Sequence, residues 1–301
     1  MNKRNKLLVF ISIFLLFGFY FLYSGYSYLR EVKLSNDLLD KEVTRCEEIL
    51  QKESSSERAY CEKIIKENSI DNLSENFYVS FQEIIIFNLN AISVLTCFAI
   101  IVLSLLQVSK ILKTKMFLNY LNRESYLKFI ISIIKEAYKS VFPILFSLII
   151  LIIYLRLNTN VFVNAEVINS IIWSKNLVSN NVPFIVIYLI KVLIYLAIYV
   201  NISLLVVRKN NNYLIAIISS LLTIIGMQLF LEIFIQKLLF KITNINFLGT
   251  FNILNIFSFN EDFGLIGTFL FPILFYLLSW ILLILFYKDK EKLIVDCESK
   301  D

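Results

Sequence analysis

The chain has 301 residues, of which 58% are hydrophobic and only 18% are charged, a balance too apolar for a soluble domain of this length. The formal net charge of +5 comes from lysines and arginines beside apolar segments, which argues against a nucleic-acid-binding module. The sequence has no histidine and no GxxxxGK[ST] loop, so it lacks the residues for histidine-dependent catalysis and for phosphate-loop ATP hydrolysis. We therefore expect neither enzymatic activity nor a cofactor or metal site.

The first apolar segment, Leu7 to Tyr28, has 22 residues, enough to cross a hydrocarbon core of about 30 Å as a helix. It is longer than the core of a cleaved signal peptide, so residues 1–29 are interpreted as a signal anchor. The charged residues before it, Lys3, Arg4 and Lys6, are all basic, whereas residues 30–83 carry 8 basic and 13 acidic residues. Because lysine and arginine near span ends stay in the cytoplasm, we expect the amino terminus inside and residues 30–83 outside.

Five more apolar segments follow the first. The second is followed by a strongly basic link, which agrees with the same orientation. The sequence thus predicts an all-α polytopic protein of the cell membrane with six transmembrane helices, and its wealth of isoleucine, asparagine and lysine is typical of bacteria. Both termini would be cytoplasmic. The predicted parts are spans at about 84–108, 141–157, 183–207, 213–235 and 265–287 within a membrane domain of residues 84–287, and a cytoplasmic tail of residues 288–301.

Residues 30–83 are predicted to form an extracellular helical hairpin between spans one and two. Leu34–Gln51 and Glu57–Glu67 are rich in helix-forming Glu, Lys and Leu, and three serines interrupt them. Cys46 and Cys61 lie nearly symmetrically about that turn, and an outside location permits a disulfide. Closing this loop would stabilise the hairpin by roughly 3 kcal/mol. The alternative is two free cysteines on different helix faces.

The link between spans two and three, residues 109–140, is a basic cytoplasmic elbow. Its apolar residues alternate with lysines, which is typical of a helix lying in the membrane interface. A polar turn then leads into a second amphipathic helix and the third span. Such an exposed turn is suited to docking a soluble partner, although an ordinary basic loop that only sets topology would look the same. The residues of this turn are Asn122, Arg123, Glu124 and Ser125.

Three features together resemble the type-2 ABC transporter permeases, which are six-span export-type membrane subunits. The basic elbow with its Ser/Arg-containing turn resembles their coupling helix, and the last span with its Lys/Asp tail, residues 281–291, resembles their closing span. The partly apolar outer segment 236–264 is similar in position to their short re-entrant helices between spans five and six. The resemblance implies that a separate ATP-hydrolysing nucleotide-binding subunit docks at the elbow, and that two permeases pair as a homodimer or heterodimer.

The fourth predicted span contains a lysine, Lys191, and Tyr188 and Tyr195 share its helix face. Charged residues within spans usually face the bundle interior or a watery cavity. Glu232 of the fifth span lies near the same outer level, so a Lys191–Glu232 pair is hypothesised to line a translocation route. Alternatively, Lys191 reaches out to the headgroups and Glu232 lies at the interface.

Two functions fit these features. The first is the permease subunit of an ATP-driven exporter, with ATPase subunits in trans and an amphiphilic cargo such as a peptide, lipid or drug. The second is a non-transporting membrane immunity or sensor protein that binds a partner through its extracellular hairpin. Both place the chain among membrane lipids, and neither involves nucleic acid.

The predicted orientation can be tested with reporter fusions. A phosphatase fused within residues 30–83 is expected to be active, and one fused within residues 110–139 inactive, because charge asymmetry places these segments on opposite sides. A cytoplasmic reporter should give the reverse pattern. An active phosphatase within residues 110–139 would overturn the orientation and remove the predicted docking surface.

Overall fold

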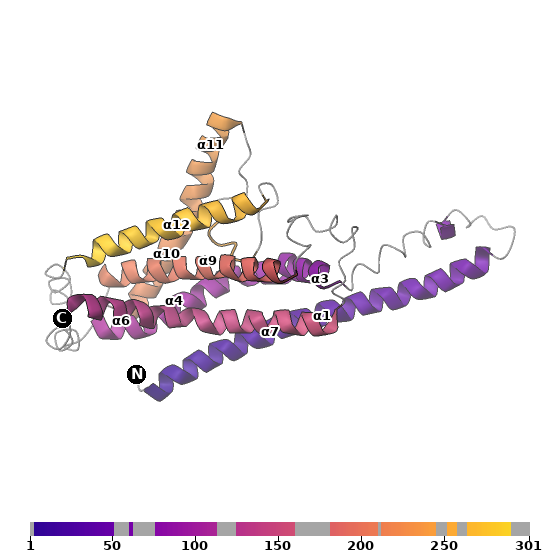
Figure 1. Ribbon diagram of the computed structural model, residues 1–301, viewed down its shortest axis with the longest axis horizontal. Coiled ribbons are helices and arrows are strands. Elements are labelled where there is room, and N and C mark those ends of the chain that lie inside the picture. Colours follow the sequence, from indigo (N-terminus) through magenta and orange to yellow (C-terminus); the bar gives the residue numbers. More distant parts are fainter. Residues whose placement is uncertain are drawn as a thin grey trace.

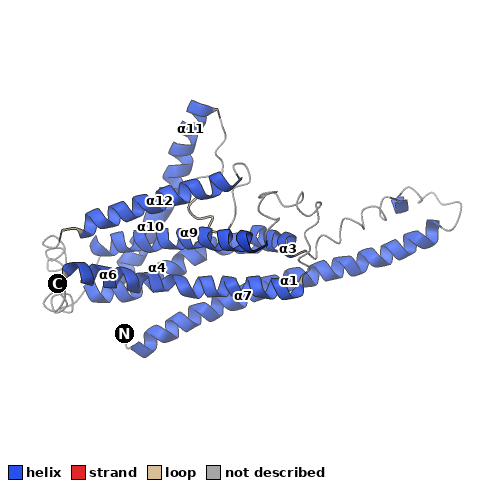
Figure 2. Ribbon diagram, in the orientation of Figure 1, coloured by secondary structure: helices blue, strands red, loops and turns tan. Residues whose placement is uncertain are grey.

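The computed structural model describes residues 3–50, 60–62, 76–112, 125–159, 181–209, 212–244, 252–257 and 264–289 (Figures 1 and 2). This part of the chain is helical apart from short links, and six of its helical stretches are long and apolar enough to cross a membrane. The predicted all-helical architecture with six helices long and apolar enough to span a membrane is thereby confirmed for this part of the chain. The candidate spans are Asn5–Leu50, Phe77–Leu106, Tyr126–Asn158, Ile185–Lys209, Tyr213–Thr243 and Phe269–Tyr287.

Helix α1 (Lys3–Leu50) joins two elements that the sequence analysis separates. It continues without interruption from the first span into the first limb of the predicted hairpin, because no glycine or proline interrupts residues 29–50. Its 48 residues correspond to about 72 Å of helix. The inner part packs along α7 (Phe142–Asn158), and the outer part projects beyond the bundle (Figure 1).

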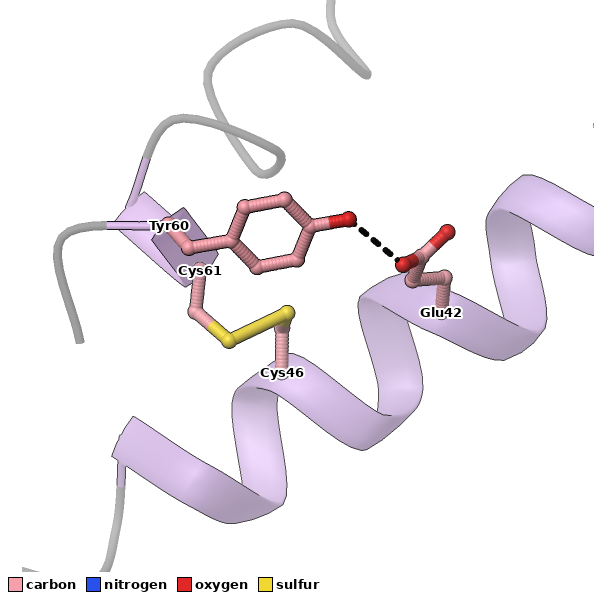
Figure 3. Close-up of a disulfide and its surroundings, with 4 residues drawn as sticks. All are labelled: Glu42, Cys46, Tyr60 and Cys61. Atoms are coloured by element: carbon pink, nitrogen blue, oxygen red, sulfur yellow. Dashed lines mark hydrogen bonds between the residues drawn. A yellow bond between two sulfur atoms is a disulfide. The ribbon is translucent and has the colours of Figure 1, made fainter. Parts of the chain in front are cut away.

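A disulfide joins the projecting end of α1 to a second piece of chain. Cys46 and Cys61 are bonded, with their Cα atoms 5.0 Å apart, which confirms the predicted bridge. Beside it the Tyr60 hydroxyl donates a hydrogen bond of 2.8 Å to Glu42 Oε1 (Figure 3). Of the predicted second limb, only the helical turn at residues 60–62 lies within the described residues, so the hairpin as a whole stays a prediction.

The second span starts earlier than its apolar run suggests. Helix α3 (Phe77–Ile84) begins at Asn76, whose Oδ1 accepts a hydrogen bond from the Tyr78 backbone N–H at 2.9 Å. A π-helical turn, η2 (Ile85–Leu89), and a 3-10 turn, η3 (Asn90–Ile92), then lead into α4 (Ser93–Leu112). The aromatic residues of α3 are buried, which explains why residues before the apolar run join the membrane bundle.

The third span is preceded by the amphipathic helix that the sequence predicts. This is α6 (Tyr126–Tyr138), which buries Phe129, Ile133 and Ala137 at spacings of four residues. The 3-10 turn η4 (Lys139–Val141) connects it to α7, where Pro143 occupies the first turn and loses no helical hydrogen bond.

Helix α9 (Asn181–Lys209) is the central element of the bundle. It packs against α4, α6, α10 (Tyr213–Phe230) and α12 (Gly264–Tyr287). Its buried residues include Tyr188, Leu196 and Tyr199, on faces that meet several of these neighbours. Because α9 is covered on so many sides, its polar side chains have to find partners within the protein.

The fifth span is longer than predicted. Helix α10 continues through a π-helical turn, η5 (Leu231–Ile235), into α11 (Gln236–Thr243), which points away from the other helices in Figure 1. Residues 236–243, the beginning of the segment that resembles short re-entrant helices, continue the helical stretch of span five. The chain turns at Asn244, which adopts a left-handed conformation with φ of 55°.

The described residues 252–257 then return to the bundle and contact α9 and α10. Helix α12 follows, with Pro272 inside it, and ends at the same end of the bundle where α1 begins (Figure 1). This arrangement agrees with an even number of crossings.

The contact between α1 and α7 provides a test of the packing. A Cβ atom added at Gly25 would lie 3.0 Å from Leu151 Cδ1 and 3.2 Å from Tyr154 Cδ1. We expect Gly25→Val to lower the stability of the purified protein by about 1–3 kcal/mol through overpacking, measured as thermal unfolding in detergent.

Gly18 of the same helix is the matched control, since its added Cβ would meet only Ser147 Oγ at 3.7 Å. Gly18→Ala is expected to leave the unfolding temperature unchanged or slightly higher. Equal stability of the Gly25→Val and wild-type proteins would show that α1 does not pack on α7 at this point.

Candidate functional site

The candidate site lies where the segment of residues 252–257 enters the bundle. Three of its side chains, Ile253, Ile256 and Phe257, are fully buried. The Phe257 ring packs edge to face on Phe21 of α1, with the ring centroids 6.0 Å apart. The segment is not helical, and although the Ile256 N–H donates to the Leu254 carbonyl at 3.0 Å, most of its backbone groups need partners on side chains.

Three side chains of α9 supply donors to the carbonyl groups of this segment. Lys191 Nζ donates to the Ile256 oxygen at 2.7 Å, and the Tyr199 hydroxyl donates to the Ile253 oxygen at 2.6 Å. Between them, the Tyr195 hydroxyl is 3.4 Å from the Asn252 oxygen. The three residues follow one another at intervals of four, so they form one row along the helix face. We call Lys191, Tyr195 and Tyr199 the donor row.

Gln228 of α10 binds the same segment from another side. Its Oε1 accepts hydrogen bonds from the backbone N–H groups of Ile253 and Leu254, at 2.6 and 3.4 Å. Its Nε2 donates to Glu232 Oε1, four residues further along the helix. The amide therefore fixes the segment and links it to the acidic residue of η5.

Lys191 is only 1% exposed, and its ammonium lies 5.1 Å from the centre of the Tyr195 ring. The residue is ten positions from the start of α9, which is about 15 Å along the helix axis. A buried ammonium on a backbone carbonyl and an aromatic face is held inside the protein. This geometry does not support the alternative in which Lys191 reaches outward to the headgroups.

The structure brings together most of the residues predicted to line a translocation route. Tyr188, Lys191 and Tyr195 are all buried on α9, and the Tyr188 ring packs edge to face on Phe81 of α3 at 5.0 Å. Glu232 is linked to the same outer segment through Gln228. Lys191 donates to the segment directly, whereas Glu232 accepts from Gln228, and a direct Lys191–Glu232 ion pair is not among the contacts of the described residues.

The sequence analysis did not identify the residues of segment 252–257 that accept hydrogen bonds from the donor row. Segment 252–257 is separated from the donor row by more than fifty positions, and its backbone atoms carry no sequence pattern. Tyr199 extends the spacing of Tyr195 by another four residues, and Gln228 is a polar residue one turn before Glu232. For both residues, the helical spacing of four from an already selected residue was the sequence signal that could have identified them.

A second polar cluster joins α6, α9 and α12 deeper in the bundle. The Tyr138 hydroxyl donates to Asn201 Oδ1 at 2.8 Å, and Asn201 Nδ2 donates to Ser279 Oγ at 2.8 Å. Asn201 is fully buried. Because each such bond fixes one helix relative to another, α9 is connected to both α6 and α12 at this level.

The predicted elbow meets the bundle at the beginning of α6. Ser125 is the residue before this helix, while Asn122, Arg123 and Glu124 lie outside the described residues. The next residue, Tyr126, donates from its hydroxyl to the Tyr287 carbonyl at the end of α12, at 2.6 Å. The Tyr287 hydroxyl in turn donates to the Leu204 carbonyl of α9 at 2.7 Å.

Arg208 completes this inner junction. It lies in the last turn of α9, is 4% exposed, and places its guanidinium 5.7 Å from the centre of the Tyr287 ring and 5.8 Å from that of Phe286. Cations at this end also compensate the helix dipole. We call Tyr126, Leu204, Arg208, Phe286 and Tyr287 the inner junction.

Comparison with known proteins adds no relative: no family model matches the chain, and no curated protein or solved structure is significantly similar to it. The functional argument therefore rests on the site itself.

The hydrogen bond from Tyr199 tests how much the donor row contributes to the fold. We expect Tyr199→Phe to lower the free energy of unfolding by about 1–3 kcal/mol, because the buried carbonyl of Ile253 loses its partner. The measurement is thermal unfolding of the purified protein in detergent. Tyr23→Phe is the matched control, since Tyr23 is 60% exposed, and it should leave stability unchanged. Equal unfolding of the two variants would contradict this role of Tyr199.

Proposed function

We propose that this chain is the membrane-spanning permease subunit of an ATP-driven exporter, which moves an amphiphilic cargo with ATPase subunits in trans. The observation that carries the proposal is the buried donor row, a lysine and two tyrosines inside a candidate span. Ionisable residues at such positions are costly in a bilayer and mark substrate or ion pathways in membrane proteins.

The position of α9 supports a mechanism of alternating exposure. Its outer half carries the donor row, which holds segment 252–257, and its inner end belongs to the inner junction. A helix packed on several neighbours moves as a rigid element, so a displacement at one end is transmitted to the other. A push on the elbow would reach α12 through Tyr126 and α9 through Tyr287. The energy would come from closure of the separate ATPase subunits.

The proposed orientation has both termini in the cytoplasm of the cell membrane and the Cys46–Cys61 bridge outside. The disulfide is consistent with an oxidising exterior. Two permease subunits would pair, with the apolar outer surfaces of the spans in contact with lipid or with each other.

A second candidate function is a non-transporting immunity or sensor protein. The observation in its favour is the projecting end of α1, which the disulfide and the Tyr60–Glu42 bond hold in a defined shape (Figure 3). Such a structured tip is suited to binding a partner. This candidate leaves the donor row and the inner junction without a role beyond stability.

Copurification distinguishes the two candidates. An affinity-tagged chain expressed in its native cell is expected to retain an ATPase with a phosphate-loop motif, identified by mass spectrometry. The charge swap Arg123→Glu with Glu124→Arg should lower the amount of retained ATPase at least tenfold. The reason is that loss of one partner from a buried interface charge pair costs about 2–5 kcal/mol of binding free energy.

The control is Lys41→Glu with Glu42→Lys on the projecting end of α1, which should retain the ATPase. Retention unaffected by the swap at Arg123 and Glu124 would contradict docking at the elbow. Absence of any ATPase from the wild-type preparation would favour the immunity or sensor function.

A further inference from the structure

We propose that η5 and α11, residues 231–243, form an arm that lies in the headgroup region of the membrane and binds anionic phospholipid. We call these residues the arm. The inference requires that span five crosses a bilayer, and it does not depend on transport. Neither η5 nor α11 has a buried residue, and α11 points away from the other helices in Figure 1. The surface of the arm is therefore covered by something outside the described bundle.

The length of span five carries the arm to the edge of the hydrocarbon core. The span begins at Tyr213, where Asn212 caps the helix just after the end of α9, and it reaches Thr243 after 31 residues. That is about 46 Å of helix, against a hydrocarbon core of about 30 Å. Even a tilt of about 40°, the upper end of the usual range, leaves the helix spanning about 36 Å of depth. The far end of the arm thus lies at the headgroup level.

The side chains of α11 are divided between two faces. Leu238, Leu239 and Ile242 share one face through spacings of three and four, and Ile242 is 71% exposed. Lys237 and Lys241 are one turn apart on another face. This division is much sharper than in α10 and comparable to that in α6, but α6 buries its apolar face in the bundle and α11 does not. An exposed apolar face beside a basic one is typical of a helix lying in the membrane interface.

The charge of α11 favours a lipid partner over a second copy of the chain. The helix contains two lysines and no acidic residue, and the nearby Glu232 of η5 accepts a hydrogen bond from Gln228. Two arms paired about a two-fold axis would bring like charges together, with no acidic residue on α11 to compensate them. Anionic headgroups supply the opposite charge, and lysine close to such a surface is attracted to it. The lysine stems can follow the apolar face while the ammonium groups reach the phosphates.

Both ends of the arm are tied to the bundle. Before it, Gln228 accepts a hydrogen bond from the Ile253 backbone N–H, and after it the chain turns at Asn244 in a left-handed conformation. Ile253 is itself buried, and its carbonyl accepts from Tyr199 of α9. Since a residue before the arm and the segment after it are hydrogen-bonded to each other, the arm is the tip of a closed loop. The bundle therefore sets the position of the arm relative to the bilayer.

Nitroxide labels test where the arm lies, in vesicles of mixed phosphatidylglycerol and phosphatidylcholine. The full chain carries Cys97→Ala and Cys297→Ser, the Cys46–Cys61 bridge is kept, and Ile242→Cys provides the single labelling site. Because the apolar face lies among the acyl chains, we expect this label to collide frequently with oxygen. Its collision rate with a water-soluble nickel complex should be at least about threefold lower than that of a label in water.

Two reference positions interpret the result. Lys41→Cys on the projecting end of α1 provides the label in water, and Leu222→Cys, at a 64% exposed position of α10, provides the label in lipid. If the label at Ile242 is as accessible to nickel as the one at Lys41, the arm lies in water. If it is protected from both reagents, protein such as a second copy of the chain covers the arm. Either result would overturn the inference.

The headgroup preference is measured by fluorescence quenching. A dye on Ile242→Cys is quenched by nitroxide-labelled phosphatidylglycerol or, in a parallel sample, by phosphatidylcholine with the same label. We expect phosphatidylglycerol to quench at least about twofold more strongly, because each lysine near the surface attracts anionic lipid. Lys237→Gln with Lys241→Gln should make the two lipids equal. Equal quenching in the chain that keeps both lysines would overturn the inference.

A matched pair of substitutions controls for the net charge of the protein. Lys128→Gln with Lys288→Gln also removes two exposed lysines, but at the end of the bundle where α6 begins and α12 ends. This variant should keep the stronger quenching by phosphatidylglycerol. Loss of the preference in both double variants would mean that overall charge, rather than the arm, attracts the lipid, and would contradict the inference.

Discussion

The peptide groups of residues 252–257 impose the main constraint on this bundle. They lie beside a candidate span and outside any helix, where each unpaired N–H or C=O group would cost several kcal/mol in hydrocarbon. Lys191, Tyr199 and Gln228 satisfy several of them from two helices at once. The segment is thereby tied to α9 and α10 together, and Lys191 is buried at this contact.

The same helix is tied at its other end by a different kind of contact. At the inner junction, a hydroxyl on each of two tyrosines bonds a carbonyl of the next helix, and the Arg208 guanidinium lies against aromatic rings. Between the two ends, Asn201 connects α9 to α6 and α12. Polar contacts are thus concentrated on one helix, while the surfaces of α10 and α12 are largely exposed and apolar. The bundle has a fixed centre and an exterior suited to lipid.

Much of this fold could be predicted from the sequence, because the bilayer imposes simple demands on composition. Long apolar runs give the spans, and the two cysteines spaced by fifteen residues give the bridge. The ends of the helices were harder to predict from the sequence. The first span and the hairpin limb form one helix because the intervening residues favour helix on either side of the membrane boundary. The hydropathy of the sequence changes at Tyr28, but the residues on both sides favour helix, so the helix does not end there.

The candidate site could be predicted from the sequence only in part. A lysine within a span and tyrosines at helical spacing are visible in the sequence, and they indicated the correct face of α9. Their acceptors are main-chain oxygens of Asn252, Ile253 and Ile256, which any residue type would provide. For that reason the sequence pointed to Glu232, an acidic residue predicted near the same membrane level, whereas in the structure Lys191 donates to the Ile256 carbonyl.

The length of α1 has a mechanical consequence. From Tyr28 to Cys46 the helix rises by about 27 Å, and the bridge anchors its far end to another stretch of chain. A continuous helix resists bending over this distance, so it acts as a lever arm whose fulcrum is the contact with α7. Any molecule that tilts the tip sideways would apply torque to the buried portion, where the neighbours of Gly25 leave no room for a larger side chain.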